Sequence, residues 1–135
     1  MEKEVIKVPV VAGVVIKQDG KYLLVQEKGP SVYGLWNLPA GRVDIGDTIE
    51  GTAVKEAKEE SGYEVELIRK LGIFQELAAE PPKHAFAAKI IGGELAWPDD
   101  EILSAGWFTL VEIENMKDQL RNSWVLAAIY LLENE

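Results

Sequence analysis

The sequence of 135 residues contains no cysteine and a single histidine. The absence of cysteine excludes disulfide bonds, thiolate nucleophiles and thiolate zinc sites, and it fits a reducing compartment. No apolar run approaches the roughly 20 residues that a membrane span needs. The first ten residues, MEKEVIKVPV, lack the arrangement of a signal peptide. We therefore expect a cytoplasmic protein that does not interact with membranes.

Basic residues are also scarce, with 14 Lys and Arg against 23 Asp and Glu and a formal net charge of −9. So acidic a protein is a poor partner for duplex nucleic acid or an anionic membrane surface. It also repels an anionic small molecule unless bound cations reverse the local potential. The hydrophobic share of 47% and the absence of repeats or linkers favour one domain over residues 1–135.

The hydrophobic pattern predicts strands interrupted by helices. Asp19-Gly20 is a typical hairpin turn between two apolar runs. The expected strands span 8–16, 21–27, 35–38, parts of 63–77 and 83–91, and 107–110, and the expected helices span 48–61, 111–116 and the stretch from 122 onward. This order predicts a mixed sheet flanked by helices, a fold of the α/β or α+β class.

The helix expected at 48–61 has signals at both ends. Asp47 and Glu50 are spaced as a capping box at its start. Gly62 follows its last residues, where a glycine in the left-handed conformation commonly ends a helix.

Three glutamates lie near the end of this helix. At about 100° per residue, Glu56 and Glu60 fall on the same stripe as Ala53 and Ala57, and Glu59 lies on its flank. Like charges one turn apart destabilise a helix, and burial beside alanines adds the cost of desolvation. A divalent cation would remove both costs, and hard oxygen ligands suit Mg²⁺ or Mn²⁺.

The segment LPAGRVDIGDTIEGTAVKEAKEESGY, residues 38–63, resembles the Nudix box, G-x5-E-x7-R-E-U-x-E-E-x-G-U, in which U is a bulky apolar residue. Asp47 replaces its first glutamate, and Lys55 replaces its arginine without the bidentate fork. The E-x-x-E-E spacing alone is also typical of a solvated face with a Lys55–Glu59 ion pair. The flanking positions favour the box, whose matching residues are Gly41, Glu56, Ala57, Glu59, Glu60, Gly62 and Tyr63.

The resemblance implies a Nudix-like α/β/α sandwich with a mixed central sheet. It also implies metal-dependent hydrolysis of a nucleoside diphosphate linked to another moiety, and family members are often homodimers. Phosphoryl transfer to water needs charge neutralisation and an aligned nucleophile more than covalent help. Asp47 and Lys55 motivate an alternative, a non-catalytic nucleotide-binding or sensor module that kept the fold and lost turnover.

Roles for the carboxylates follow from their positions. Glu56 and Glu60 are the main expected metal ligands because they share the inward stripe, and Glu59 is a further ligand or the base that deprotonates the attacking water. By resemblance, the backbone carbonyl of Ala40 also binds metal. Glu101 stands where many family members carry a later acidic residue, so it is either a base or second-metal ligand or an ordinary surface acid.

Three residues are candidates for substrate binding. Arg42 is placed to meet a phosphate or to cover the acidic cluster. Asn37 is polar within an apolar strand and needs a hydrogen-bond partner, either substrate or backbone. Tyr33, in a loop of Gly, Pro and Ser, is a better stacking platform for a base than Trp36, which we expect in the core. Trp124 is expected to be a packing residue.

Two classes of nucleotide substrate fit the sequence. The L-P-A-G-R form of the box entrance, residues 38–42, resembles family members acting on oxidised purine nucleotides such as 8-oxo-dGDP. The same entrance resembles ADP-ribose hydrolases equally well.

Overall fold

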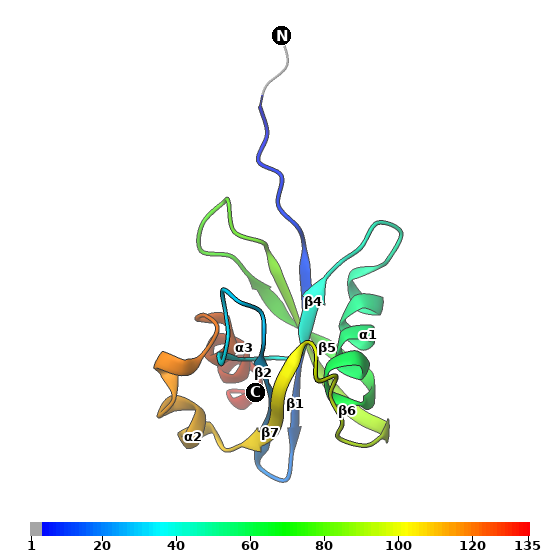
Figure 1. Cartoon of the computed structure of the whole chain (residues 1–135), viewed down its shortest axis with the longest axis vertical. Coiled ribbons are helices and arrows are strands. Elements are labelled where there is room, and N and C mark those ends of the chain that lie inside the picture. The colour runs from blue at the N-terminus through cyan, green and yellow to red at the C-terminus, as the bar shows by residue number, and fades with distance from the viewer. Residues whose placement is uncertain (1–3) are drawn as a thin grey trace.

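Strand β1 (Val11–Gln18) lies at the centre of a mixed sheet in the computed structural model, which describes residues 4–135 (Figure 1). It runs parallel to β6 (Lys83–Gly93) and antiparallel to β2 (Lys21–Glu27) and β4 (Ala40–Arg42). The remaining elements are β3 (Trp36–Asn37), α1 (Ile49–Ser61), β5 (Tyr63–Phe74), β7 (Ile102–Phe108), α2 (Leu110–Glu114), the 3-10 helix η1 (Lys117–Gln119) and α3 (Trp124–Glu133). The strand order is β3-β2-β1-β6-β5, with β4 paired to β1 and β7 paired to β2.

Helices α1 and α3 cover opposite faces of this sheet (Figure 1). In β1, Val14 packs in one core with Ala53 and Ala57 of α1, whereas Val15 packs in the other core with Trp124 of α3. Because both faces are buried, β1 reads as a continuous apolar run, as is typical of a strand covered on both sides. The α/β/α sandwich with a mixed sheet is thus confirmed.

The hairpin between β1 and β2 is also confirmed. Asp19 and Gly20 have φ angles of +53° and +77°. A two-residue turn of this kind requires the left-handed conformation at both positions, and Asp-Gly adopts it at low cost.

Only the C-terminal end of α1 forms as the sequence predicts. Gly62 has a φ of +82° and ends the helix as predicted. The predicted capping box of Asp47 and Glu50 is wrong, because Thr48 is the N-cap and its hydroxyl accepts from the backbone N–H of Gly51 at 2.9 Å. The Asp47 carboxylate pairs instead with a lysine side chain, so it is not available as a cap.

Two strands differ from their expected extents. Residues 40–42 of the box entrance form a short strand, β4, that the sequence does not predict, and they pair with β1 from Val11 to Gly13. Strand β7 begins at Ile102, although the sequence predicts a strand only from Trp107. The small residues at 104–106 hide the strand pattern there, and pairing with β2 supplies the order that local preference does not. No helix within residues 4–135 is long and apolar enough to cross a membrane.

Candidate active site

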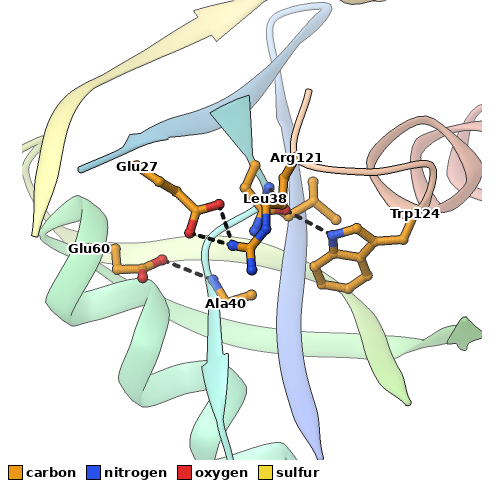
Figure 2. Close-up of polar contacts among 7 residues, drawn as sticks. Glu27, Leu38, Ala40, Glu60, Arg121 and Trp124 are labelled. Carbon is orange, nitrogen blue, oxygen red and sulfur yellow. Dashed lines mark hydrogen bonds and ion pairs between the residues drawn. The ribbon is translucent and has the colours of Figure 1, made fainter. Parts of the chain in front are cut away.

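The entrance strand β4 lies against the C-terminal half of α1, and two contacts fix the distance between them. Glu60 accepts a hydrogen bond at Oε1 from the backbone N–H of Ala40, at 2.9 Å (Figure 2). At Gly41, a Cβ atom would lie 2.1 Å from Oε1 of Glu56. Only glycine therefore leaves room for the Glu56 carboxylate to lie against this backbone.

Burial, together with the charges of neighbouring carboxylates, raises the pKa of two glutamates in this region. Burial, followed by the charge of Glu59, raises the pKa of Glu56 to about 7. Burial also raises the pKa of Glu60 well above its usual range, opposed by the backbone hydrogen bond and reinforced by the charges of Glu56, Glu27 and Glu101. The fold thus holds several acids close enough to disfavour their charged forms.

The predicted face of α1 is confirmed. Ala53 and Ala57 are fully buried, Glu56 and Glu60 are partly buried beside them, and Glu59 is exposed on the flank. The glutamates therefore lie between the core and solvent, where a bound ion can reach them.

Lys55 does not pair with Glu59, contrary to the alternative of a solvated helix face. Its Nζ lies 3.5 Å from a carboxylate oxygen of Asp44 and 3.5 Å from one of Asp47. The charge of Asp47 is the main cause of its raised pKa. Lysine at this position therefore fastens the loop before α1 to the helix.

The donor set suits a hard divalent cation, although it is not a preformed centre. Within residues 4–135, no three His, Cys, Asp or Glu side chains are gathered in the arrangement of a metal site. The glutamates of α1 nevertheless offer only oxygen ligands, which Mg²⁺ and Mn²⁺ prefer. Glu56, Glu59 and Glu60 fit such an ion, and ligation by the Ala40 carbonyl stays a prediction.

An open cleft of about 590 Å³ begins where β4 meets the acidic cluster. Ala40 and Gly41 lie in its wall and also contact Glu60 and Glu56, so the cleft and the carboxylates share this boundary. The cleft wall carries acids and bases in equal number, namely Glu27, Glu76, Glu80, Arg42, Lys83 and Arg121. A negatively charged ligand would therefore meet basic side chains in the cleft, next to the glutamates of α1.

Asn37 lines this cleft with its amide held in one orientation. Its Oδ1 accepts hydrogen bonds from the indole Nε1–H of Trp124 at 2.8 Å and from the backbone N–H of Leu38 at 2.9 Å. Both partners can only donate, so the acceptor must be the oxygen. The Nδ2 amide group of Asn37 is thereby left as a donor. Trp124, expected to be a packing residue only, therefore orients a cleft residue as well.

A second polar pair of the cleft has no counterpart in the sequence predictions. Nη1 of Arg121 donates to both carboxylate oxygens of Glu27, at 2.9 and 2.8 Å (Figure 2). The backbone N–H of Arg121 donates to the carbonyl of Trp36 at 2.8 Å. Glu27 and Arg121 are 94 positions apart in the sequence, so no local sequence pattern connects them.

The other predicted residues are distributed unevenly around the cleft. Arg42 lies in its wall, whereas Tyr33 is 63% exposed and is not part of the wall. Trp36 packs edge-on against Phe108 with ring centroids 4.9 Å apart, in agreement with its expected core position. Glu101 is exposed in the turn before β7, yet its charge contributes to the raised pKa of Glu56 and Glu60.

Comparison with known proteins agrees with this geometry. The family model described as the NUDIX domain matches residues 7–128. The "Putative nudix hydrolase 1" of Caenorhabditis elegans is 38% identical over 116 residues, which are 83% of this chain and 32% of that protein. The "Putative 8-oxo-dGTP diphosphatase" of Bacillus subtilis (strain 168) is 32% identical over 139 residues, with 89% of this chain and 91% of that protein covered. This chain therefore spans about a third of the first relative and most of the second.

Among solved structures, a NUDIX hydrolase from Nitrosomonas europaea superposes with a TM-score of 0.84 at 26% identity. The superposition covers 95% of this chain and 90% of the other. The match of the family model to nearly the whole chain, together with the box on α1 and this fold, shows that the chain belongs to the NUDIX domain family.

Proposed function

We propose that the protein is a divalent-metal-dependent pyrophosphohydrolase acting on a nucleoside diphosphate linked to another moiety. The observation that carries the proposal is the pairing of Glu56 and Glu60 on one partly buried stripe of α1, where burial raises the pKa of both. Such an arrangement is costly in a structural helix and useful in a metal site. Its position at the edge of an open cleft gives a diphosphate access to it.

Each carboxylate has a distinct part in this proposal. Glu56 and Glu60 hold the cation, and bound Mg²⁺ or Mn²⁺ supplies the charge neutralisation that phosphoryl transfer requires. Glu59 and Glu101 are the residues placed to accept the proton of the attacking water, because both lie close to the cluster and remain exposed. Gly41 keeps the Glu56 carboxylate in position.

The proposed substrates are oxidised guanine nucleotides, such as 8-oxo-dGDP or 8-oxo-dGTP. Asn37 presents its Nδ2 donors, which suit the carbonyl oxygens of such a base, and the carboxylates of Glu76 and Glu80 in the same wall suit its N–H groups. The printed name of the Bacillus subtilis relative supports the same class. The L-P-A-G-R entrance supports it as well, although ADP-ribose hydrolases share that entrance.

A substrate panel tests the proposal. Purified protein is incubated with 8-oxo-dGDP, dGDP, 8-oxo-dGTP, dGTP, ADP-ribose, nucleotide sugars and dinucleoside polyphosphates, with Mg²⁺, with Mn²⁺ and with EDTA. We expect metal-dependent release of phosphate or pyrophosphate, fastest from the oxidised guanine nucleotides. A preference for ADP-ribose would contradict the base assignment and leave the reaction class intact. The Glu60→Gln variant serves as the matched inactive control.

The same panel distinguishes an enzyme from a non-catalytic nucleotide-binding module. A sensor would bind an oxidised guanine nucleotide in calorimetry and release no product during long incubation with either metal. Absence of metal-dependent turnover across the whole panel would contradict the proposed function.

A further inference from the structure

Arg121 carries more hydrogen-bond donors than its pairing with Glu27 uses. Both hydrogen bonds to the carboxylate leave from Nη1. Among the hydrogen bonds of residues 4–135, neither Nη2 nor Nε of Arg121 has a protein acceptor. A guanidinium has five N–H groups in a planar fork, so three of them stay available while the pair is intact.

Two separate contacts hold this side chain in place. The backbone N–H of Arg121 donates to the Trp36 carbonyl, and Leu120 forms an isolated parallel β-bridge with Trp36. The segment before α3 is thereby held against β3. At its other end the guanidinium is fixed by Glu27, at the end of β2. An arginine held at both ends loses little further freedom when it binds an anion.

The guanidinium lies in the cleft wall between the acidic helix and the residues around Asn37. Figure 2 shows Arg121 between Glu60 on one side and Trp124 on the other, with Glu27 paired to it. Ala40, whose N–H donates to Glu60, lies in the same cleft wall as Glu27 and Arg121, so the pair is close to the acids of α1. A nucleotide with its phosphates at the acids and its base near Asn37 would pass this point.

We propose that Arg121 is a substrate-binding residue that donates to the diphosphate, and that Glu27 is the positioning residue that aims it. This inference rests on the proposed function for its ligand class, a phosphoric anhydride. Arg121 then supplies a cation in the cleft wall, beyond the cation that the glutamates of α1 would hold. Pairing with Glu27 also reduces the repulsion that this acid would exert on the phosphates.

The other bases of the cleft are less well prepared for this role. Lys83 donates to the carbonyl of Pro81 at 3.2 Å and is a point donor without a fork. Arg42 has no hydrogen bond or ion pair from its side chain among the described residues, so it must lose more side-chain freedom on binding. Arg121 is the base that the fold orients in advance.

Calorimetry with two probes tests the inference without requiring turnover. The probes are inorganic pyrophosphate and the non-hydrolysable guanosine 5′-(α,β-methylene)diphosphate, each titrated in MgCl₂. We expect Arg121→Gln to weaken both by about tenfold to a hundredfold, the usual effect of losing a charge-assisted hydrogen bond. Arg121→Lys should lie between Arg121→Gln and wild type, because it keeps the charge and loses the fork.

A second arginine provides the matched control. Arg69 on β5 also forms an exposed ion pair, with Glu135, and it does not lie in the cleft wall. Arg69→Gln should bind both probes as the wild type does. Glu27→Gln should weaken binding in the wild-type background, where its role acts through Arg121. In the Arg121→Gln background it should not weaken binding further, because there it only removes an unpaired negative charge.

The outcomes separate this inference from the proposed function. Wild-type affinity of Arg121→Gln for both probes would overturn it, and so would a wild-type protein that binds neither probe. Weaker binding of the nucleotide analogue with unchanged binding of pyrophosphate would also overturn it, because the contact would then be to the nucleoside. A lower melting temperature with unchanged affinity would show that the pair only fastens the chain. Hydrolysis of the substrate panel judges the proposed function independently.

Discussion

Trp124 of α3 and Asn37 of β3 are 87 residues apart and are joined by a buried hydrogen bond of 2.8 Å from indole Nε1 to amide Oδ1. This bond links the helix on one face of the sheet to the strand that leads into the box. It also decides which end of the amide faces the cleft, because an indole N–H can only donate.

Trp124→Phe should therefore affect both stability and substrate binding. Loss of the hydrogen bond and of part of the ring should lower the free energy of unfolding by ~1–3 kcal/mol. Freed from the indole, the Asn37 amide can rotate, so KM for the best guanine nucleotide should rise more than kcat falls. Urea denaturation and steady-state kinetics measure the two effects. Trp97→Phe is the control, since Trp97 lies in a separate cluster; an equal rise in KM there would contradict the orienting role.

Gly41→Ala tests the close approach of β4 to α1, the helix that carries the three glutamates. The added Cβ would lie 2.1 Å from Oε1 of Glu56, and the end of that flexible side chain would move before the backbone does. We expect a folded protein whose turnover falls by roughly a hundredfold, the cost of a small displacement of a catalytic group. Gly72→Ala is the control, because a Cβ there meets only ordinary contacts at 3.6 Å. Full activity of Gly41→Ala would show that Glu56 need not lie against this strand.

Glu60→Gln should lower turnover by orders of magnitude while leaving the fold intact. The amide keeps the shape and can still accept the hydrogen bond from the Ala40 N–H, but it removes a partly buried charge beside Glu56. Without metal the variant should therefore melt at a higher temperature than the wild type. The wild type should gain stability on addition of Mg²⁺ and the variant much less, as thermal melting in EDTA and in Mg²⁺ would show. Near-normal turnover would refute the ligand assignment.

The helix that carries the site could be predicted from the sequence because its signals are local. Burial of Ala53 and Ala57, the inward position of Glu56 and Glu60, and the end at Gly62 all follow from spacing along one helix. The expected capping box of Asp47 and Glu50 is not formed, because a neighbouring hydroxyl and a tertiary ion pair compete for the same positions. Local rules set the helix, and contacts with the preceding loop set its first turn.

The cleft could be predicted only in part, since it is built from distant segments. Asn37 and Arg42 precede the box and could be singled out by residue type. Glu27 and Arg121 could not, because their pairing depends on α2 and η1 returning the chain to β3. Loop composition favours Tyr33, but composition does not say where a loop side chain points, and Tyr33 is not part of the cleft wall.

The metal-free protein should lose stability as the pH rises from about 4.5 to about 7. Burial and the charge of Glu59 raise the pKa of Glu56 from 4.5 to about 7, so the folded state retains a proton that the unfolded chain has released. Stability then falls with pH across this window, because the folded state binds more protons. Urea denaturation in EDTA at several pH values measures the slope. Glu56→Gln should reduce it and leave the part that the raised pKa of Glu60 contributes. A slope that is unchanged in this variant would assign the dependence to other groups.

The Glu101→Gln variant tests whether Glu101 accepts the proton of the attacking water. Glu101 is exposed and outside α1, but its charge reaches both Glu56 and Glu60. If it is the base, kcat should fall steeply while calorimetric affinity for the methylene analogue stays close to the wild-type value. The acidic limb of the pH–rate profile should also shift or disappear. Asp100→Asn, in the same exposed turn, controls for loss of a nearby charge.

Glu59→Gln completes this assignment. Glu59 lies on the exposed flank of α1, so it can reach a water at the cluster without occupying the position of a main ligand. If Glu101→Gln is active and Glu59→Gln is not, the base lies on the helix, and the turn before β7 contributes only charge. If both single variants lose turnover, two measurements distinguish them. Loss of the base removes the acidic limb of the pH–rate profile, whereas loss of a ligand raises the metal concentration needed for half-maximal rate. Full activity in both variants would leave the mechanism without a base, and the proposed division of roles among the acids would be wrong.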